Sequence, residues 1–360
     1  MKFGFPRPIR LEDYCPSSYL IDKITLDICV DIKNTSVTSR LHIRKNPLSK
    51  KNTSPLVLDG HALELKAISL DGRKLSPSEY ISTNTRLEIP KVPAHPFTLE
   101  TTVTINPEKN LALQGLYLSR GIFCTQCEAE GFRRITYFID RPDILSIYTC
   151  RIEANKKMAP VLLCNGNLIQ KGDLNEGRKH YAIWHDPFPK PCYLFAMVAG
   201  DLSSVHSSFK TKSGKSVKLG IYVEHGKEAL TSWAMDSLKR SMRWDEKVYK
   251  REYDLNIFNI VAVSDFNMGA MENKGLNIFN DRLILASEKT ATDSTFEAIE
   301  SVVAHEYFHN WTGNRITCRD WFQLCLKEGL TVYRDQEFSA DERDRTVQRI
   351  ADVRQLKTMQ

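Results

Sequence analysis

The stretch Val302–Asn314, VVAHEYFHNWTGN, places two histidines four residues apart with a glutamate directly after the first. On a helix, four residues advance about 6 Å and turn about 40° past a full turn, so His305 and His309 can converge on one metal ion. Glu306 projects about 100° away, where its carboxylate can reach a water molecule beside the ion without being a ligand. The pattern also arises by chance in on the order of one in a hundred such chains. Two ordinary helix histidines are therefore the alternative.

A third ligand is needed, because a catalytic zinc ion takes three protein ligands and keeps a fourth position open. In QLCLKEGLTVYRDQEF, Glu328 follows His309 by nineteen positions. The apolar spacing predicts a second packed helix, formed around Leu324, Leu326, Leu330 and Val332. Two histidines and one carboxylate would leave zinc electrophilic enough to bring the pKa of its water to about 7. The alternative for Glu328 is a solvated carboxylate on a helix face.

A group that hydrogen-bonds a metal-binding histidine and orients its ring is also predicted. Asp335 lies two helical turns beyond Glu328 and on the same face. It is therefore the candidate for a carboxylate that orients a metal-binding histidine, although a surface acid explains it equally well.

Upstream lies FNMGAMENKGLNIFN, residues 266–280, in which two small residues precede a glutamate. Gly269 and Ala270 carry almost no side chain, so another backbone can approach and pair with this segment like an added strand. Glu272 then places a carboxylate beside that backbone. The alternative, a loop or edge strand with a solvated glutamate, is what composition alone favours.

Alternating apolar residues predict strands in the first half of the chain. Residues 24–32, ITLDICVDI, are apolar at every second position, and the period recurs at Phe97, Leu99, Val103 and Ile105. Asp71-Gly72 and Asn165-Gly166 can adopt positive φ and are predicted to close hairpins. We therefore expect an antiparallel β domain over residues 1–201.

Helices are expected to dominate residues 202–360. Two alternating strands, KLGIYVEH and IFNIVAVSDF, flank a helical stretch near residues 230–249. Asp293-Ser294 followed by Glu297 predicts a capping box at the start of the histidine-bearing helix, and Gly313 is its predicted stop. The buried stripe of that helix would comprise Phe296, Ile299, Val302 and Val303.

Composition excludes several classes of protein. With 42% apolar and 26% charged residues, the chain has the composition of a soluble globular protein. The opening segment, MKFGFPRPIRLEDYCPSSY, lacks the apolar core of a secretory signal. The longest strongly apolar run, CYLFAMVAG, is far shorter than the ~20 residues of a membrane span. The net charge of +6 is scattered, so neither nucleic acid nor membrane is an expected partner.

The nine cysteines are an odd number spread thinly over a long chain. That usage favours free thiols in a reducing cytoplasm over a disulfide framework. The single CxxC, Cys124 to Cys127, has no second pair at zinc-ribbon spacing, so a structural zinc is not expected there.

Several separated segments resemble the aminopeptidase N family of zinc metallopeptidases, specifically its bacterial alanyl aminopeptidase branch. They are HEYFHNWTGN with KEG downstream, GAMEN at 269–273, and the blocks LYLSRGIFCTQCEAEGFRRITYFIDRPD and DPFPKPCYLFAMVAGD. The likeness runs from about Asp13 to the end of the chain. It implies an α+β, multidomain fold with an N-terminal antiparallel β-sandwich-like domain. Part of a thermolysin-like α/β zinc-peptidase domain would follow.

The resemblance implies one Zn²⁺ per chain and a role for each residue of the metal motif. His305, His309 and Glu328 would be the zinc ligands. Glu306 would be the general base that takes a proton from the attacking water and returns it to the leaving amine.

The resemblance also implies a site for peptides with a free N-terminus. Glu272 and Glu128 would grip the α-ammonium, and two carboxylates around one ammonium would reject an acetylated terminus. The other substrate-binding positions would be Gln126, in the first side-chain pocket, and Gly269, Ala270, Met271 and Asn273 of GAMEN. We therefore expect a monomeric, cytoplasmic aminopeptidase that removes alanyl and other N-terminal residues.

The chain departs from the family pattern after the third ligand. Family members use a downstream tyrosine as an oxyanion donor, and this chain stops before it; Tyr333, on the helix of Glu328, cannot stand in. We therefore expect an N-terminal piece of a longer enzyme, in which loss of the donor lowers the rate by about 10² to 10³. Two alternatives stay open: an endopeptidase that cleaves N-acetylated peptides, and a remnant that binds peptide or zinc without turnover.

Overall fold

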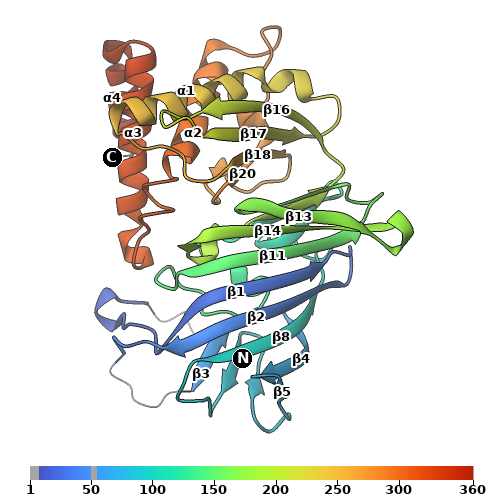
Figure 1. The fold of residues 1–360 in the computed structure, drawn as a ribbon. Helices are drawn as coiled ribbons and strands as arrows, with labels where there is room; N and C mark the ends of the chain where they lie inside the picture. The colour runs from blue at the N-terminus through green and yellow to red at the C-terminus, as the bar shows by residue number, and fades with distance from the viewer. Residues whose placement is uncertain (1–7, 50–54, 360) are drawn as a thin grey trace, which may run out of the picture.

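The computed structural model describes residues 8–49 and 55–359 (Figure 1). β-Sheets form the N-terminal half, coloured blue to green, and the four α-helices gather with a further sheet at the opposite end. The expected α+β fold class is thereby confirmed. The first seven residues of the opening segment, in which no secretory signal was expected, lie outside the described residues.

The largest sheet has eight strands in the order β13-β14-β11-β1-β2-β8-β4-β5. Their bounds are β13 (Asn167–Leu174), β14 (Lys179–Lys190), β11 (Ser146–Asn155), β1 (Tyr19–Cys29), β2 (Thr35–Lys45), β8 (Phe97–Ile105), β4 (Glu64–Leu70) and β5 (Arg73–Lys74). Ile24, Leu26 and Ile28 alternate on its buried face as predicted. The expectation of a purely antiparallel domain is wrong at one position, because β1 runs parallel to β11.

Two smaller sheets complete the N-terminal half. One has the order β12-β15-β10-β9 and the other the order β3-β7-β6. Their bounds are β12 (Val161–Cys164), β15 (Met197–Gly200), β10 (Ile122–Gln126), β9 (Gly115–Ser119), β3 (Leu56–Asp59), β7 (Arg86–Ile89) and β6 (Ile81–Ser82). The strands β3, β6, β7, β9 and β10 lie in the long connection between β1 and β11, which a parallel pair requires, whereas β12 and β15 follow β11.

The two predicted turns have different outcomes. Asp71 and Gly72 have φ of 49° and 80° and join β4 to β5, whose flanking residues pair, so this hairpin is confirmed. Gly166 also has a positive φ, 87°, but it joins β12 to β13, which lie in different sheets. The hairpin prediction is wrong there. A Cβ at Gly166 would lie 2.3 Å from the carbonyl oxygen of His185, so the turn needs glycine for close approach as well.

A five-stranded mixed sheet carries the C-terminal half, in the order β16-β17-β18-β20-β19. Its strands are β16 (Ser203–Lys210), β17 (Ser216–Val223), β18 (Ile257–Val263), β20 (Leu276–Asn280) and β19 (Ala270–Met271). Val261 and Val263 join the core of the N-terminal half, whereas Ile260 and Ala262 face the core beneath the helices. Successive residues of β18 thus bury both faces of the sheet. The division between residues 201 and 202 stays a prediction.

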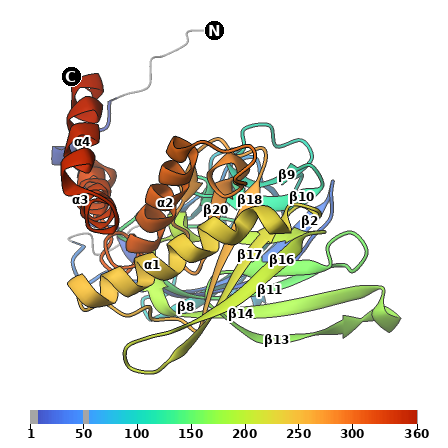
Figure 2. The same ribbon diagram turned by 90° about the horizontal axis from the view of Figure 1, so that it is seen from above.

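The helices are α1 (Ser232–Val248), α2 (Asp293–Phe308), α3 (Leu324–Glu342) and α4 (Arg345–Met359). Seen from above, α1 and α2 lie over the five-stranded sheet, and α3 and α4 follow each other along one side (Figure 2). Short 3₁₀ helices occupy Leu11–Asp13, Phe132–Arg134, Asn175–Gly177, Cys192–Leu194, Glu228–Thr231, Asp281–Leu283 and Trp321–Gln323. Within the described ranges, no helix combines the length and apolarity needed to cross a membrane.

The ends of α2 correct two predictions. Its N-cap is Thr292, and Thr295 completes the capping box, so the box predicted at Ser294 and Glu297 is wrong. Several residues with hydroxyl side chains follow one another here, so the sequence does not show which of them is the N-cap. Thr292 is the N-cap because its backbone is extended. The helix ends at Phe308, ahead of the predicted stop at Gly313. Its buried stripe includes Ile299 and Val303, as expected.

The face of α3 that is buried also differs from the prediction. Leu324, Leu326 and Leu330 are exposed, although their spacing predicted a packed apolar stripe. The buried side is largely polar and comprises Lys327, Thr331, Arg334, Asp335, Phe338, Ser339 and Ala340. Polar groups are stable in this position because they pair with other elements, as Asp335 does with His305 of α2 and Arg334 does with Asp245 of α1.

Candidate metal and substrate site

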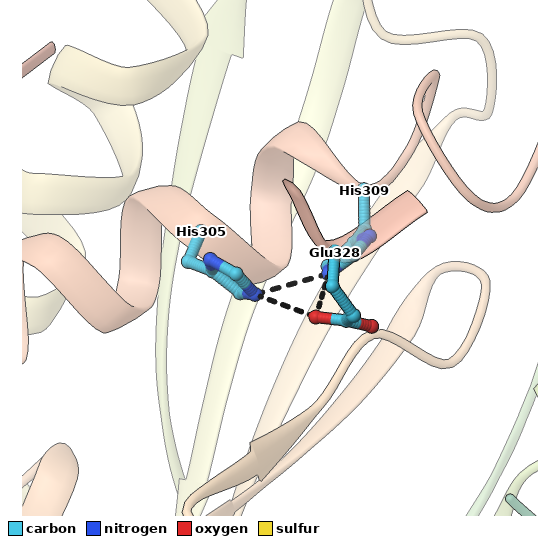
Figure 3. Close-up of side chains that lie close together, drawn as sticks. All are labelled: His305, His309 and Glu328. Carbon is cyan, nitrogen blue, oxygen red and sulfur yellow. Dashed lines mark hydrogen bonds and ion pairs between the residues drawn. The ribbon is translucent and has the colours of Figure 1, made fainter. Parts of the chain in front are cut away.

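Two histidines meet at the C-terminal end of α2. His305 lies in its last turn, and His309 follows Phe308 as the C-cap with helical φ and ψ of −57° and −18°. Helical geometry therefore extends through both residues, and their Nε2 atoms lie 3.0 Å apart. Figure 3 shows both imidazoles directed at the same point.

Glu328 reaches this point from the first turns of α3 (Figure 3). Its Oε2 atom lies 3.5 Å from the Nε2 atoms of both His305 and His309. The three donor atoms all lie within 4.8 Å of one another, a grouping that could hold a metal ion. Two imidazoles and one carboxylate are a donor set that zinc accepts in catalytic sites.

Hydrogen bonds at the outer nitrogen of each ring fix how the imidazoles are presented. His305 Nδ1 lies 2.6 Å from the Oδ2 atom of Asp335, in agreement with the partner expected from the sequence. His309 Nδ1 lies 2.8 Å from the carbonyl oxygen of Thr312 and 3.2 Å from the Oγ1 atom of Thr331. A carbonyl or carboxylate only accepts, so each Nδ1 donates its proton and each Nε2 keeps a lone pair for a ligand.

Glu306 presents an unsatisfied carboxylate beside this donor set. The residue is buried, and its Oε2 atom has no hydrogen-bond partner among the described residues. Burial raises the pKa of the Glu306 carboxyl above its usual range. An acceptor without a partner in this position is suited to take a proton from a water molecule. A neighbouring cation would offset the free-energy cost of burying the carboxylate without a hydrogen bond.

Two more carboxylates converge here from opposite halves of the chain. Glu128 follows β10 in the N-terminal half, and Glu272 follows β19 of the five-stranded sheet. Their Oε1 atoms lie 2.9 Å and 2.5 Å from one amino group, the Nζ atom of Lys327. The carboxylate oxygens of Glu128, Glu272 and Glu328 also lie within 4.8 Å of one another. Burial raises the pKa of Glu128 to about 7.

The other predicted substrate positions lie in the same two segments of the chain as Glu128 and Glu272. Ala270 and Met271 form β19, the edge strand of its sheet, and Gly269 precedes it. An edge strand has unpaired backbone groups that another chain can bind. Gln126 and Asn273 are buried, and among residues 8–49 and 55–359 neither the Oε1 atom of Gln126 nor either amide atom of Asn273 has a hydrogen-bond partner. The side chain of Met271 is part of the hydrophobic core.

Buried links that the sequence did not reveal join the substrate segment to the turn after α2. Asn314 Nδ2 donates to the backbone oxygen of Glu272 at 2.8 Å. Lys274 Nζ donates to Asp254 at 2.6 Å and to the Oδ1 atom of Asn310 at 2.7 Å. These contacts hold residues 272–274 against the residues that follow His309. One indication of this contact was present in the sequence: GAMEN at 269–273 and HEYFHNWTGN at 305–314 both resemble the same family.

Known proteins resemble this chain along its length. The peptidase M1 N-terminal domain matches residues 15–194, and the peptidase family M1 domain matches residues 233–360. Aminopeptidase N of Caulobacter vibrioides is 56% identical over 360 residues, which is 100% of this chain and 41% of that protein. Aminopeptidase N of Escherichia coli is 50% identical over 355 residues, 99% of this chain and 40% of that protein.

A solved structure gives the same result for the fold. The crystal structure of Legionella pneumophila aminopeptidase A in complex with aspartic acid has a TM-score of 0.89 and 38% identity, covering 92% of this chain and 39% of that one. The fold and the two matched domains place the chain in the class of peptidases. Within that class, the chain belongs to peptidase family M1. It spans about two-fifths of the length of the curated relatives that it matches.

Proposed function

We propose that the protein is a zinc-dependent aminopeptidase that hydrolyses N-terminal residues, alanyl and others, from peptides. One observation carries the proposal: Glu128 and Glu272 come from separate halves of the chain and already bind an ammonium group, that of Lys327, beside the His-His-Glu set. Two carboxylates in this position select a peptide by its charged terminus. An endopeptidase has no need of them.

The residues would divide the work of hydrolysis among them. His305, His309 and Glu328 would hold the zinc ion, which when bound supplies a Lewis acid for the scissile carbonyl. Glu272 and Glu128 would bind the α-ammonium and so fix which peptide bond lies at the site. The Oε2 atom of Glu306 would take a proton from the attacking water and deliver it to the leaving amine.

The substrate backbone would be held by the edge strand. Gly269 and the β19 residues Ala270 and Met271 would pair with the peptide as with an added strand, and Gln126 would line the first side-chain pocket. All nine cysteines are free thiols, which is in keeping with a reducing compartment. We further propose that the protein is cytoplasmic and monomeric.

The test uses the 360-residue chain, with its zinc content quantified, on matched alanyl substrates with a free or an N-acetylated terminus. Turnover of the free substrate alone is expected. The Glu306→Gln variant should lose about 10²- to 10⁴-fold in rate while retaining zinc. Glu297→Gln, which changes an exposed glutamate on the same helix, is the matched control. Hydrolysis of the acetylated substrate would rule out an aminopeptidase, and a zinc-loaded chain without turnover would favour a binding protein.

A further inference from the structure

Lys327 is a buried lysine at the centre of the carboxylate cluster. Its side chain is 1% exposed, and its Nζ atom lies 2.5 Å from Glu272 Oε1, 2.5 Å from Glu328 Oε1 and 2.9 Å from Glu128 Oε1. It precedes Glu328 on α3, so the two side chains diverge by about 100° around the helix. Glu328 thereby faces the histidines through its other oxygen, while Lys327 points to the junction of the two halves.

The stem of Lys327 is held in this position by its surroundings. The Nζ atom lies 5.5 Å from the centre of the Tyr193 ring, a cation–π distance. The Tyr193 hydroxyl is itself fixed by a 2.9 Å hydrogen bond with the Oγ1 atom of Thr317. The ammonium group is thus placed by packing from both halves of the chain.

The three carboxylates around Lys327 have the spacing of a metal site. One oxygen from each of Glu128, Glu272 and Glu328 lies within 4.8 Å of the others, and such a group could hold a cation. The group that they contact is the ammonium of Lys327. A protein cation therefore stands where a second divalent ion would otherwise find three oxygen ligands next to the His-His-Glu set.

Formal charges show what this arrangement achieves. When all are ionised, the four carboxylates of Glu128, Glu272, Glu306 and Glu328 carry −4, without Asp335, whose carboxylate pairs with the outer nitrogen of His305. One zinc ion and Lys327 reduce this to −1, which a single substrate ammonium neutralises. Without Lys327 the zinc-loaded site would keep −2, the charge that a second divalent ion would match. Excess buried charge of this size is unfavourable, so the site would attract such an ion.

We propose that Lys327 is a built-in cation that excludes a second divalent metal ion from the Glu128-Glu272-Glu328 cluster and keeps the site mononuclear. The inference rests on the proposed function, because it takes the His-His-Glu set as the zinc site. Lys327 acts as a positioning residue: it holds one oxygen of Glu128 and one of Glu272. The second oxygen of each carboxylate is left for the ammonium of a substrate.

The test is the zinc stoichiometry of the folded 360-residue chain, measured by equilibrium dialysis with zinc in molar excess. The parent should bind one zinc ion per chain and Lys327→Met should bind two. The Lys327→Met/Glu128→Gln double variant should return to one, because it lacks a ligand of the second site. Lys327→Arg, which retains the charge, should also bind one. A purely structural role for Lys327 would not produce this pattern.

Each outcome decides a separate point. A Lys327→Met chain that folds and binds one zinc ion overturns the inference about Lys327 and leaves the proposed function untouched. A parent that binds no zinc overturns the proposed function itself. Should Lys327→Met fail to fold, the parent still provides a test. A second zinc ion bound by the parent and lost in Glu128→Gln would show that Lys327 excludes nothing.

Discussion

The Nδ1 atom of His305 lies 2.6 Å from the Oδ2 atom of Asp335, so a carboxylate on α3 holds an imidazole on α2. The contact fixes the proton on Nδ1 and directs Nε2 toward His309 and Glu328. Helix α3 therefore contributes twice to the proposed metal site, through Glu328 as a proposed ligand and through Asp335 as the group that orients His305.

Removing this orienting carboxylate should weaken metal binding. Asp335→Ala leaves the three donor atoms in place but frees the His305 ring, and outer partners of this kind change metal affinity by about 10- to 100-fold. Competition with a chromophoric zinc chelator measures the affinity. Glu337→Gln, which changes a partly exposed acid on the same helix, should leave it unaltered. Equal affinities for parent and Asp335→Ala would exclude this role.

The carboxylates of Glu128 and Glu272 should determine how efficiently a substrate with a free N-terminus is hydrolysed. Glu272→Gln and Glu128→Gln each remove a charge-assisted hydrogen bond of about 1.5 to 3 kcal/mol, which corresponds to roughly 10- to 100-fold in kcat/KM for a free alanyl substrate. Steady-state kinetics provide the measurement. Glu130→Gln, an exposed neighbour in the same loop, is the control. If the control lost as much as the two variants, the pair would have no special function.

Lys274 should matter for stability because its ammonium group is buried against Asp254 and Asn310. Among the residues that the structure describes, Lys274→Met leaves Arg315 as the remaining cation paired with Asp254. Breaking a buried pair in this way lowers the free energy of unfolding by about 3 to 5 kcal/mol. Denaturant titration measures this free energy for Lys274→Met and for the control Lys156→Met. The control removes the exposed ion pair of Lys156 with Asp173, which contributes about 0 to 1 kcal/mol. Losses of similar size in both variants would contradict the account.

A pH effect is expected at the buried pair of Asp245 on α1 and Arg334 on α3. Burial raises the pKa of Asp245 to about 6, above the value near 4 of an unfolded chain. The folded state therefore holds this proton more tightly, and the contribution to stability falls as pH rises from about 4 to about 6.

Asp245→Asn removes that titration. Unfolding free energies of parent and variant, measured from pH 4 to 7, should differ by an amount that changes across this window and is constant above it. A constant difference throughout would show that the carboxyl titrates normally.

Much of the fold and of the donor set follows from local patterns. The alternation at Ile24, Leu26 and Ile28 predicts a strand because a half-buried strand has period two. The spacing of His305 and His309 requires only a helix. The pairing of Asp335 with His305 needs one further assumption, that α3 packs against α2.

Features that depend on packing between distant segments could not be predicted from local sequence patterns. The parallel pairing of β1 with β11 joins residues more than a hundred positions apart and leaves no local trace. The leucines of α3 have helical spacing, yet the polar face is buried because it meets the carboxylates and histidines of other elements. The position of Lys327 depends on Glu128 and Glu272, which come from two other segments.

X-ray absorption at the zinc edge tests the central claim most directly, on the zinc-loaded 360-residue chain. The account predicts one zinc ion per chain with nitrogen and oxygen neighbours at about 2.0 to 2.2 Å, including imidazole scattering that is lost in His309→Ala. A sulfur shell near 2.3 Å, or an unchanged spectrum in His309→Ala, would contradict it.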